Sequence, residues 1–147
     1  METNNTTANL TIVLDKEFWT VYHNEQDRIF EAVWHDKGRE MEDEEFRQYI
    51  SEFAALFKDY PTVRGFMVDT RAYHFMMVEE IQEWHDQFII PQYIEAKLEK
   101  IAFIMSEEFI VSISIEQAFD EEIAQAEKTF DLVSFSNPED ARAWIVE

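Results

Sequence analysis

The chain has 147 residues, enough for one domain, and 46 % of them are hydrophobic. Its 32 acidic and 12 basic residues give a formal net charge of −20. This apolar fraction excludes wholesale disorder, which needs few apolar residues as well as high charge. With no cysteine and only two glycines, the chain lacks the material for disulfides, cysteine nucleophiles, thiolate metal sites and glycine-rich phosphate loops.

Charge and hydropathy also limit the partners. Nucleic acids and anionic membrane surfaces bind proteins through Lys and Arg, and the bases here are scattered among acids, so we expect neither partner. No apolar run reaches the ~18 residues of a membrane span, and the polar start is unlike a signal peptide, which predicts a cytoplasmic protein. The acids are expected to form a solvated surface. The alternative is an acidic face for a basic partner, densest at residues 116–127.

The beginning of the chain has the period of β-strands. Residues 1–9 are polar and are expected to form a disordered leader. Apolar residues then alternate over 10–14, 18–22 and 29–34, with a polar turn cluster at 23–27. This pattern predicts a β-hairpin with two different faces.

The period then changes to that of helices. Apolar residues recur at helical spacing over 46–57, after three acids that suit a helix N-terminus, and Pro61 is expected to stop this helix. A second helical stripe runs over 78–89 and is expected to end at Pro91. These two stripes predict amphipathic helices that pack on the sheet.

Two short apolar runs, 65–69 and 101–105, predict strands that are buried on both faces. Because such strands are covered twice, we expect their large side chains to be nearly inaccessible to solvent. The side chains in question are Phe66, Val68, Ile101 and Phe103.

The last part of the chain completes an alternating order. Ser114 and Gln117 form a capping box that opens a predicted helix. Residues 132–135 predict a strand, and Asn137 is expected to cap a final helix that begins at Pro138.

The predicted order is therefore a β-hairpin followed by α-β-α-β-α-β-α. Strands alternating with helices form a sheet with a parallel part and helices packed against it. We predict an α/β fold, with a single domain over residues 10–147 and a mixed sheet of five or six strands.

Five short motifs underlie a resemblance to a known family, which covers roughly residues 10–146. They are Glu45-Phe46-Arg47, Val68-Asp69-Thr70-Arg71, Glu83-Trp84 with Pro91, Lys100-Ile101-Ala102-Phe103, and Glu139-Asp140-Ala141-Arg142-Ala143-Trp144. With them the chain resembles the small bacterial STAS-like or SpoIIAA-like proteins, which share a fold with anti-sigma-factor antagonists and, loosely, with CRAL-TRIO lipid carriers. The resemblance implies a STAS-like fold and a regulatory or protein-interaction role.

The resemblance also implies one modification site. In anti-sigma-factor antagonists, a Ser just after a strand-ending Asp is phosphorylated, and Thr70 follows Asp69 in a comparable place. Thr70 is therefore a candidate phosphorylation site. The antagonist pattern continues with Ser and Gly, whereas Arg71 and Ala72 stand here.

Five residues form the candidate ligand site: Asp69, Thr70, Arg71, Trp84 and His85. The first three lie at the carboxyl end of a buried strand, where open α/β sheets bind ligands. Asp69 could accept a hydrogen bond from a polar ligand, and Arg71 could donate one to a polar or anionic ligand. In the alternative interpretation, Asp69 caps the following turn, Arg71 pairs with an acid, and His85 beside Trp84 is a satisfied, partly buried residue.

No motif indicates catalysis. The four histidines lack HExxH or H-x-H spacing, so no metal site is expected. Glu79, Glu80 and Glu83 fit a solvated helix face better than paired catalytic carboxylates. Nucleophile elbows, Walker loops and dinucleotide fingerprints are absent from the sequence. We predict a non-enzymatic protein without a cofactor.

Two functions remain open from the sequence. The first is a regulatory or protein-interaction module of STAS-like type, and the second is a domain that binds a small molecule or lipid in the crevice near Asp69 and Trp84. A filled core with an exposed apolar patch favours the first, and a closed apolar cavity favours the second. Met76 and Met77 stand out, because they fall in a loop beside Phe75.

A homodimer is also predicted. The hairpin carries more aromatic surface than one sheet face needs, and exposed apolar strands near a sheet edge tend to be covered. We expect a second subunit to cover it, with the chain's own helices as the alternative. The residues concerned are Trp19, Val21, Tyr22 and Trp34.

Overall fold

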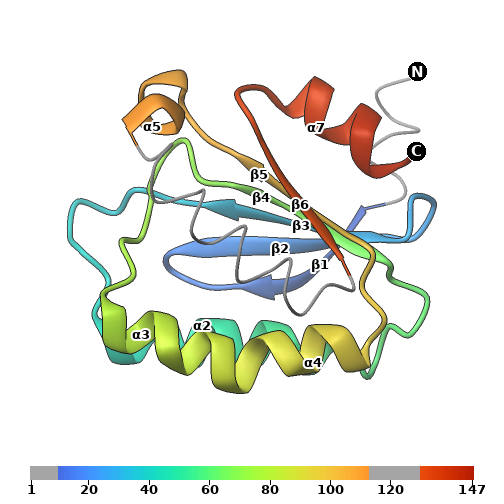
Figure 1. Cartoon of the computed structure of the whole chain (residues 1–147), viewed down its shortest axis with the longest axis horizontal. Helices are drawn as coiled ribbons and strands as arrows, with labels where there is room; N and C mark the ends of the chain where they lie inside the picture. Colours follow the sequence, from blue (N-terminus) through green and yellow to red (C-terminus); the bar gives the residue numbers. More distant parts are fainter. Residues whose placement is uncertain (1–9, 113–129) are drawn as a thin grey trace.

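Six strands form one mixed sheet in the computed structural model, which describes residues 10–112 and 130–147 (Figure 1). The strands are β1 Leu10–Asp15, β2 Trp19–Asn24, β3 Ile29–Trp34, β4 Gly65–Asp69, β5 Lys100–Ile104 and β6 Asp131–Phe135. Their order in the sheet is their order in the chain. β1, β2 and β3 pair antiparallel, and β3 to β6 pair parallel. The predicted α/β class with a mixed sheet is confirmed.

Helices lie on both sides of the sheet (Figure 1). Their bounds are α2 Asp43–Leu56, α3 Glu79–Trp84, the π-helix η1 His85–Ile89, α4 Ile90–Glu95, α5 Glu107–Ser112 and α7 Pro138–Ile145. α2, α3 and α4 lie on one face, and α7 lies on the other. The predicted cap of α7 is confirmed, because the Asn137 side chain accepts a hydrogen bond of 2.8 Å from the Asp140 N–H.

Three predictions lie outside the described residues. They are the disordered leader at 1–9, the capping box at Ser114 and Gln117, and the acidic stretch at 116–127.

The predicted turn between β2 and β3 is shorter than expected. β2 runs to Asn24, so His23 and Asn24 pair with β3 instead of turning. Asn24 then holds the turn, because its Oδ1 accepts a hydrogen bond of 3.0 Å from the Asp27 N–H. Arg28 closes the turn with a φ of 60°, a conformation rare outside glycine.

The expectation that Pro91 ends the second helix is wrong. α3, η1 and α4 run on without a break to Glu95. The π-turn explains the continuation: the Ile90 N–H donates to His85 O, five residues back, so Pro91 enters the first turn of a new α-helical segment. A first-turn position needs no N–H, so proline is tolerated there. The extra residue also shifts the stripe, and Phe88 is exposed while Ile89 is buried.

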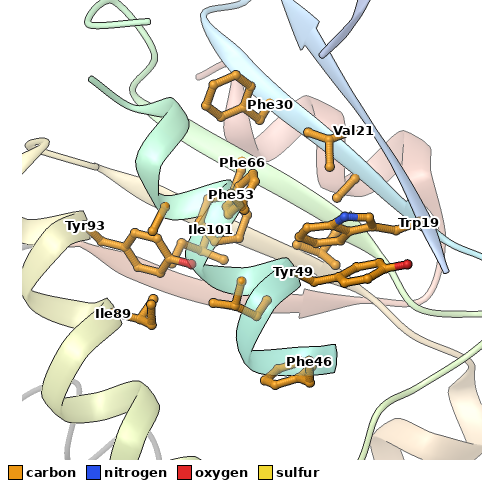
Figure 2. Close-up of a cluster of buried hydrophobic side chains, with 14 of the residues drawn as sticks. Trp19, Val21, Phe30, Phe46, Tyr49, Phe53, Phe66, Ile89, Tyr93 and Ile101 are labelled. Carbon is orange, nitrogen blue, oxygen red and sulfur yellow. The ribbon is translucent and has the colours of Figure 1, made fainter. Parts of the chain in front are cut away.

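An aromatic core fills the space between the sheet and α2 (Figure 2). Phe53 of α2 lies at its centre, with ring centroids 5.5 Å from Trp19, 5.6 Å from Phe30 and 4.9 Å from Phe66. Each ring pair meets edge to face, a preferred geometry for aromatic side chains.

The same helix, α2, packs on the tryptophans of the hairpin. Trp19, Val21 and Trp34 are buried within the single chain. Tyr49 of α2 packs on both tryptophans, with centroid distances of 5.8 Å and 6.2 Å. The expectation that a second subunit covers these three residues is therefore wrong, because the chain's own packing buries them. Tyr22 is only partly buried, and its cover by a second subunit stays a prediction. A homodimer through another surface stays a prediction.

Four residues were expected to be nearly inaccessible to solvent, and Phe103 does not meet this expectation. Phe66, Val68 and Ile101 are buried, as predicted, but Phe103 is only partly buried at the margin of the aromatic core. Val68 and Phe103 are register partners, so the difference arises from the cover above the sheet and not from the strand pairing.

A second, smaller core lies under α7. Ala141 and Ile145 of this helix pack on Ile29, Met67 and Ala102 of the sheet. The helix is also held by ion pairing, because Arg142 donates to both carboxylate oxygens of Glu31 at 2.7 and 3.0 Å.

Candidate functional site

Asp69, Thr70 and Arg71 form a closed corner at the carboxyl end of β4. The Asp69 carboxylate accepts hydrogen bonds from the Arg71 N–H at 3.0 Å, from Nε at 3.0 Å and from Nη2 at 2.8 Å. The same carboxylate raises the pKa of Arg71 above its ordinary value. The alternative weighed from the sequence, a capping Asp69 and a paired Arg71, therefore describes this geometry.

Thr70 faces inward. Its side chain is 7 % exposed, and its Oγ1 donates a hydrogen bond of 3.0 Å to Ile104 O. The Thr70 N–H donates to the same oxygen at 2.9 Å, which joins the corner to β5. A phosphate on Thr70 would need this corner to open.

Trp84 and His85 lie apart from that corner. Both are partly buried on the long helix, where the Trp84 ring receives Arg47 at 5.9 Å and the His85 ring lies 6.3 Å from Tyr93. Among the described residues, no hydrogen bond, ion pair or ring contact joins them to Asp69, Thr70 or Arg71.

The strand order bears on the predicted crevice as well. Open α/β sheets bind ligands where the strand order reverses, because the loops there turn to opposite faces. Here β3 to β6 follow one another without a reversal. The parallel part of the sheet therefore has no switch point beside Asp69.

The loop that follows the corner is held by α2 and by the segment just before it. The Tyr73 hydroxyl accepts a hydrogen bond of 2.9 Å from the Met41 N–H. The Phe75 ring stacks on Phe46 with centroids 4.1 Å apart and an interplanar angle of 6°. These two contacts hold residues 73–75 in place. From there the chain continues to the start of α3 (Figure 1).

Directly after these anchors the loop turns apolar side chains into solvent. Met76 is 61 %, Met77 36 % and Val78 52 % exposed. Three consecutive exposed apolar residues are unusual on a surface of this charge, since scattered single residues are the ordinary case. We call residues 76–78 the apolar loop. The sequence singled out its two methionines, whereas the anchors that hold it are long-range contacts.

A pocket that the sequence did not predict lies at the other end of the parallel strands, where they begin. Its volume is about 360 Å³, and it is lined chiefly by the starts of β3, β4 and β5 and by the end of α7. The lining includes Arg28, Arg64 and Lys100. A signal was available: a basic residue stands at or just before the start of three strands whose amino ends meet at one edge.

Other kinds of site were sought in the described residues. In that part of the chain, no three His, Asp or Glu side chains gather as metal ligands would. None of the described helices has the length and apolar character of a membrane span.

Comparison with known proteins adds no relative. The chain has no significant match to a protein-family model, to a curated protein or to a solved structure.

Proposed function

We propose that this chain is a non-enzymatic regulatory module of the STAS-like type, which acts by docking a partner protein on the apolar loop. The observation that carries the proposal is the exposure of Met76, Met77 and Val78 next to two anchoring contacts. An anchored loop loses little conformational freedom on binding, so more of the contact energy contributes to affinity. Methionine adapts its shape to different apolar surfaces, which suits a docking residue.

The surroundings of the apolar loop indicate the chemistry of the partner. Glu79 and Glu80 follow the loop directly and are exposed. Arg47 pairs with Glu80 at 3.5 Å but also with Glu44 at 2.9 Å, so the rim stays acidic. We infer a partner that presents apolar side chains flanked by Lys or Arg, because complementary charge steers association and excludes wrong partners.

The packing supports this function over a ligand carrier. Edge-to-face aromatic rings fill the space between α2 and the sheet (Figure 2). Among the described residues, no hydrogen bond, ion pair or ring contact joins Trp84 or His85 to the Asp69 corner. A filled core with an exposed apolar patch is the combination expected of an interaction module.

Site-specific photo-crosslinking in cells tests the proposal. A photoreactive amino acid replaces Met76 in one strain and Ile12 in another, since Ile12 on β1 is similarly exposed at 55 %. We expect a discrete protein adduct from position 76 alone, identified by mass spectrometry. Calorimetry with that purified partner should then show binding weakened by about tenfold in Met76→Ser/Met77→Ser, and unchanged in Ile12→Ser.

Two results would contradict the proposal. One is identical adducts from both positions, together with unchanged partner affinity in the double variant. The other is a small molecule retained in native mass spectrometry and lost in Trp84→Ala, which would instead support a ligand-binding domain.

A further inference from the structure

Methionine carries all the sulfur of this chain. The sequence has six methionines and no cysteine, so no thiol competes with them for an oxidant. Methionine is oxidised to its sulfoxide, and reductases can return the sulfoxide to the thioether. The exposure of each methionine therefore decides which of them an oxidant in solution reaches.

The five described methionines fall into two groups. The sulfur-bearing side chains of Met41, Met67 and Met105 are buried, with exposed fractions between 4 % and 7 %. Met76 is 61 % and Met77 36 % exposed, and both belong to the apolar loop. An oxidant therefore has access to the docking surface, while the methionines of the interior are protected by the fold.

The two contacts that anchor the loop involve neither of the exposed sulfur atoms. They are the hydrogen bond of the Tyr73 hydroxyl and the stacking of the Phe75 ring, both on residues directly before the apolar loop. Among the described residues, Met76 and Met77 are members of neither hydrophobic core. A sulfoxide at either position would therefore change the surface of the loop and leave its anchors intact.

The oxidation by hydrogen peroxide is a balanced two-electron step. The thioether sulfur attacks one peroxide oxygen, and the S–O bond forms while the O–O bond breaks. The leaving oxygen takes up the proton of the transferred oxygen and departs as water, so the thioether is oxidised and the peroxide is reduced. Hydrogen peroxide is uncharged, and the field of a chain of net charge −20 does not repel it.

A sulfoxide removes the property that makes the loop a docking surface. Its oxygen is polar, and burying a polar group against an apolar partner without a hydrogen-bond donor costs free energy. Glu79 and Glu80 follow the loop, but ionised carboxylates only accept hydrogen bonds and cannot satisfy that oxygen. The basic groups inferred for the partner are attracted to these same carboxylates. Docking on the oxidised loop should therefore be weaker.

We propose that Met76 and Met77 are a modification site, at which a peroxide forms sulfoxides and so weakens docking on the apolar loop. This role rests on the proposed function, because it supplies the regulation of that docking surface. Enzymatic reduction of the two sulfoxides should restore docking.

The first test is the selectivity of the oxidation. The purified protein is treated with hydrogen peroxide, and peptide mapping by mass spectrometry follows the gain of oxygen at each methionine. We expect Met76 and Met77 to react at least about tenfold faster than the three buried methionines, with an unchanged circular dichroism spectrum. Met1 lies outside the described residues and is followed in its own peptide. Equal rates at buried and exposed methionines, or unfolding during the reaction, would overturn the proposal.

The second test measures docking after oxidation. A photoreactive amino acid replaces Val78, which is 52 % exposed, so that both methionines stay in place. The purified protein is oxidised, freed of peroxide, mixed with a dialysed cell lysate and irradiated, so the partner itself is never oxidised. The yield of the partner adduct identified in cells should fall by about tenfold.

Met76→Leu/Met77→Leu is the matched control for this measurement. Leucine keeps both positions apolar and has no sulfur to oxidise, so the adduct of this variant should survive the same treatment. The variant retains the four other methionines, which means that a difference from the wild-type protein arises at positions 76 and 77.

The possible outcomes separate the modification from docking itself. No adduct from the unoxidised protein would overturn both proposals. An adduct of equal yield before and after complete oxidation of Met76 and Met77 would overturn the modification site and leave docking in place. An equal loss in the wild-type protein and in the leucine variant would do the same, because oxidation elsewhere would then be the cause.

Discussion

Phe75 stacks face to face on Phe46, and so joins the loop after β4 to the helix before it. Phe46 in turn lies parallel to Trp34 of β3, with centroids 6.4 Å apart and planes 15° apart. The apolar loop is thus connected through two stacked rings to the middle of the sheet. Its exposure is a property of a fixed loop and not of a frayed one.

Phe75→Ala should free the apolar loop while leaving the sheet intact. We expect a loss of roughly 1–2 kcal/mol in the free energy of unfolding, since Phe75 is partly buried and an aromatic pair adds about 0.5–1.5 kcal/mol. Hydrogen exchange should accelerate over residues 73–78 and stay slow in β4. Phe88→Ala, which removes an exposed ring, should change stability by less than about 0.5 kcal/mol. Equal effects of both variants would show that the stack anchors nothing.

Replacing Phe by Ala should lower the free energy of unfolding by different amounts at positions 53 and 103. Phe53→Ala should cost about 3–5 kcal/mol in urea unfolding, because it empties the centre of the aromatic core. Phe103→Ala should cost about half as much, since Phe103 is partly exposed at the margin. Similar losses for both would mean that Phe103 is covered as fully as Phe53.

The local pattern of the sequence was enough for most elements of the fold. Alternation placed β3 within its observed bounds, and helical spacing placed α2. Both elements have one buried face, so the period of their side chains records which residues turn inward. The same reasoning wrongly ended the second helix at Pro91. A π-turn before Pro91 adds one residue to the helix, and the period of the side chains does not reveal this turn.

Long-range geometry explains the rest of the difference. Phe103 has the same local pattern as Val68, yet it is only partly buried, because burial depends on what packs above the sheet and the local pattern does not record that. The candidate ligand site combined Asp69 with Trp84 on the assumption of a crevice, which requires a reversal of strand order that the sheet lacks. Met76 and Met77 were recognised from their loop position, whereas the Phe75–Phe46 stack depends on residues 29 positions apart in this sequence.

The Thr70 hydroxyl provides a test of the corner at the end of β4. Thr70→Val keeps the shape and removes the hydrogen bond to Ile104 O, which should cost roughly 0.5–1.5 kcal/mol. Thr62→Val, at an exposed position, should change stability by less than about 0.5 kcal/mol.

Thr70→Glu extends this test to the candidate phosphorylation. A carboxylate placed at this buried position should destabilise the fold by more than about 2 kcal/mol, because an unpaired charge is costly to bury. A Thr70→Glu protein as stable as wild type would show that the corner opens readily, and the hydroxyl would then be within reach of a kinase.

His74 should make stability depend on pH. Burial lowers the pKa of His74 below its ordinary value of 6.5, its Nδ1 has no hydrogen-bond partner among the described residues, and its ring packs 4.0 Å from Phe109. The unfolded chain therefore takes up the proton first as the pH falls. Stability should be fully present above about pH 6.5 and should be lost progressively as the pH falls toward the lower pKa of the folded state.

The measurement is the urea midpoint of wild type and His74→Phe over this pH range. Phenylalanine keeps the ring contact with Phe109 but cannot be protonated, so the variant should lose less stability on acidification than wild type. The two proteins differ only at position 74, so the difference between their slopes is the quantity that reports His74. Parallel slopes would mean that His74 is protonated as easily in the folded protein as in the unfolded chain.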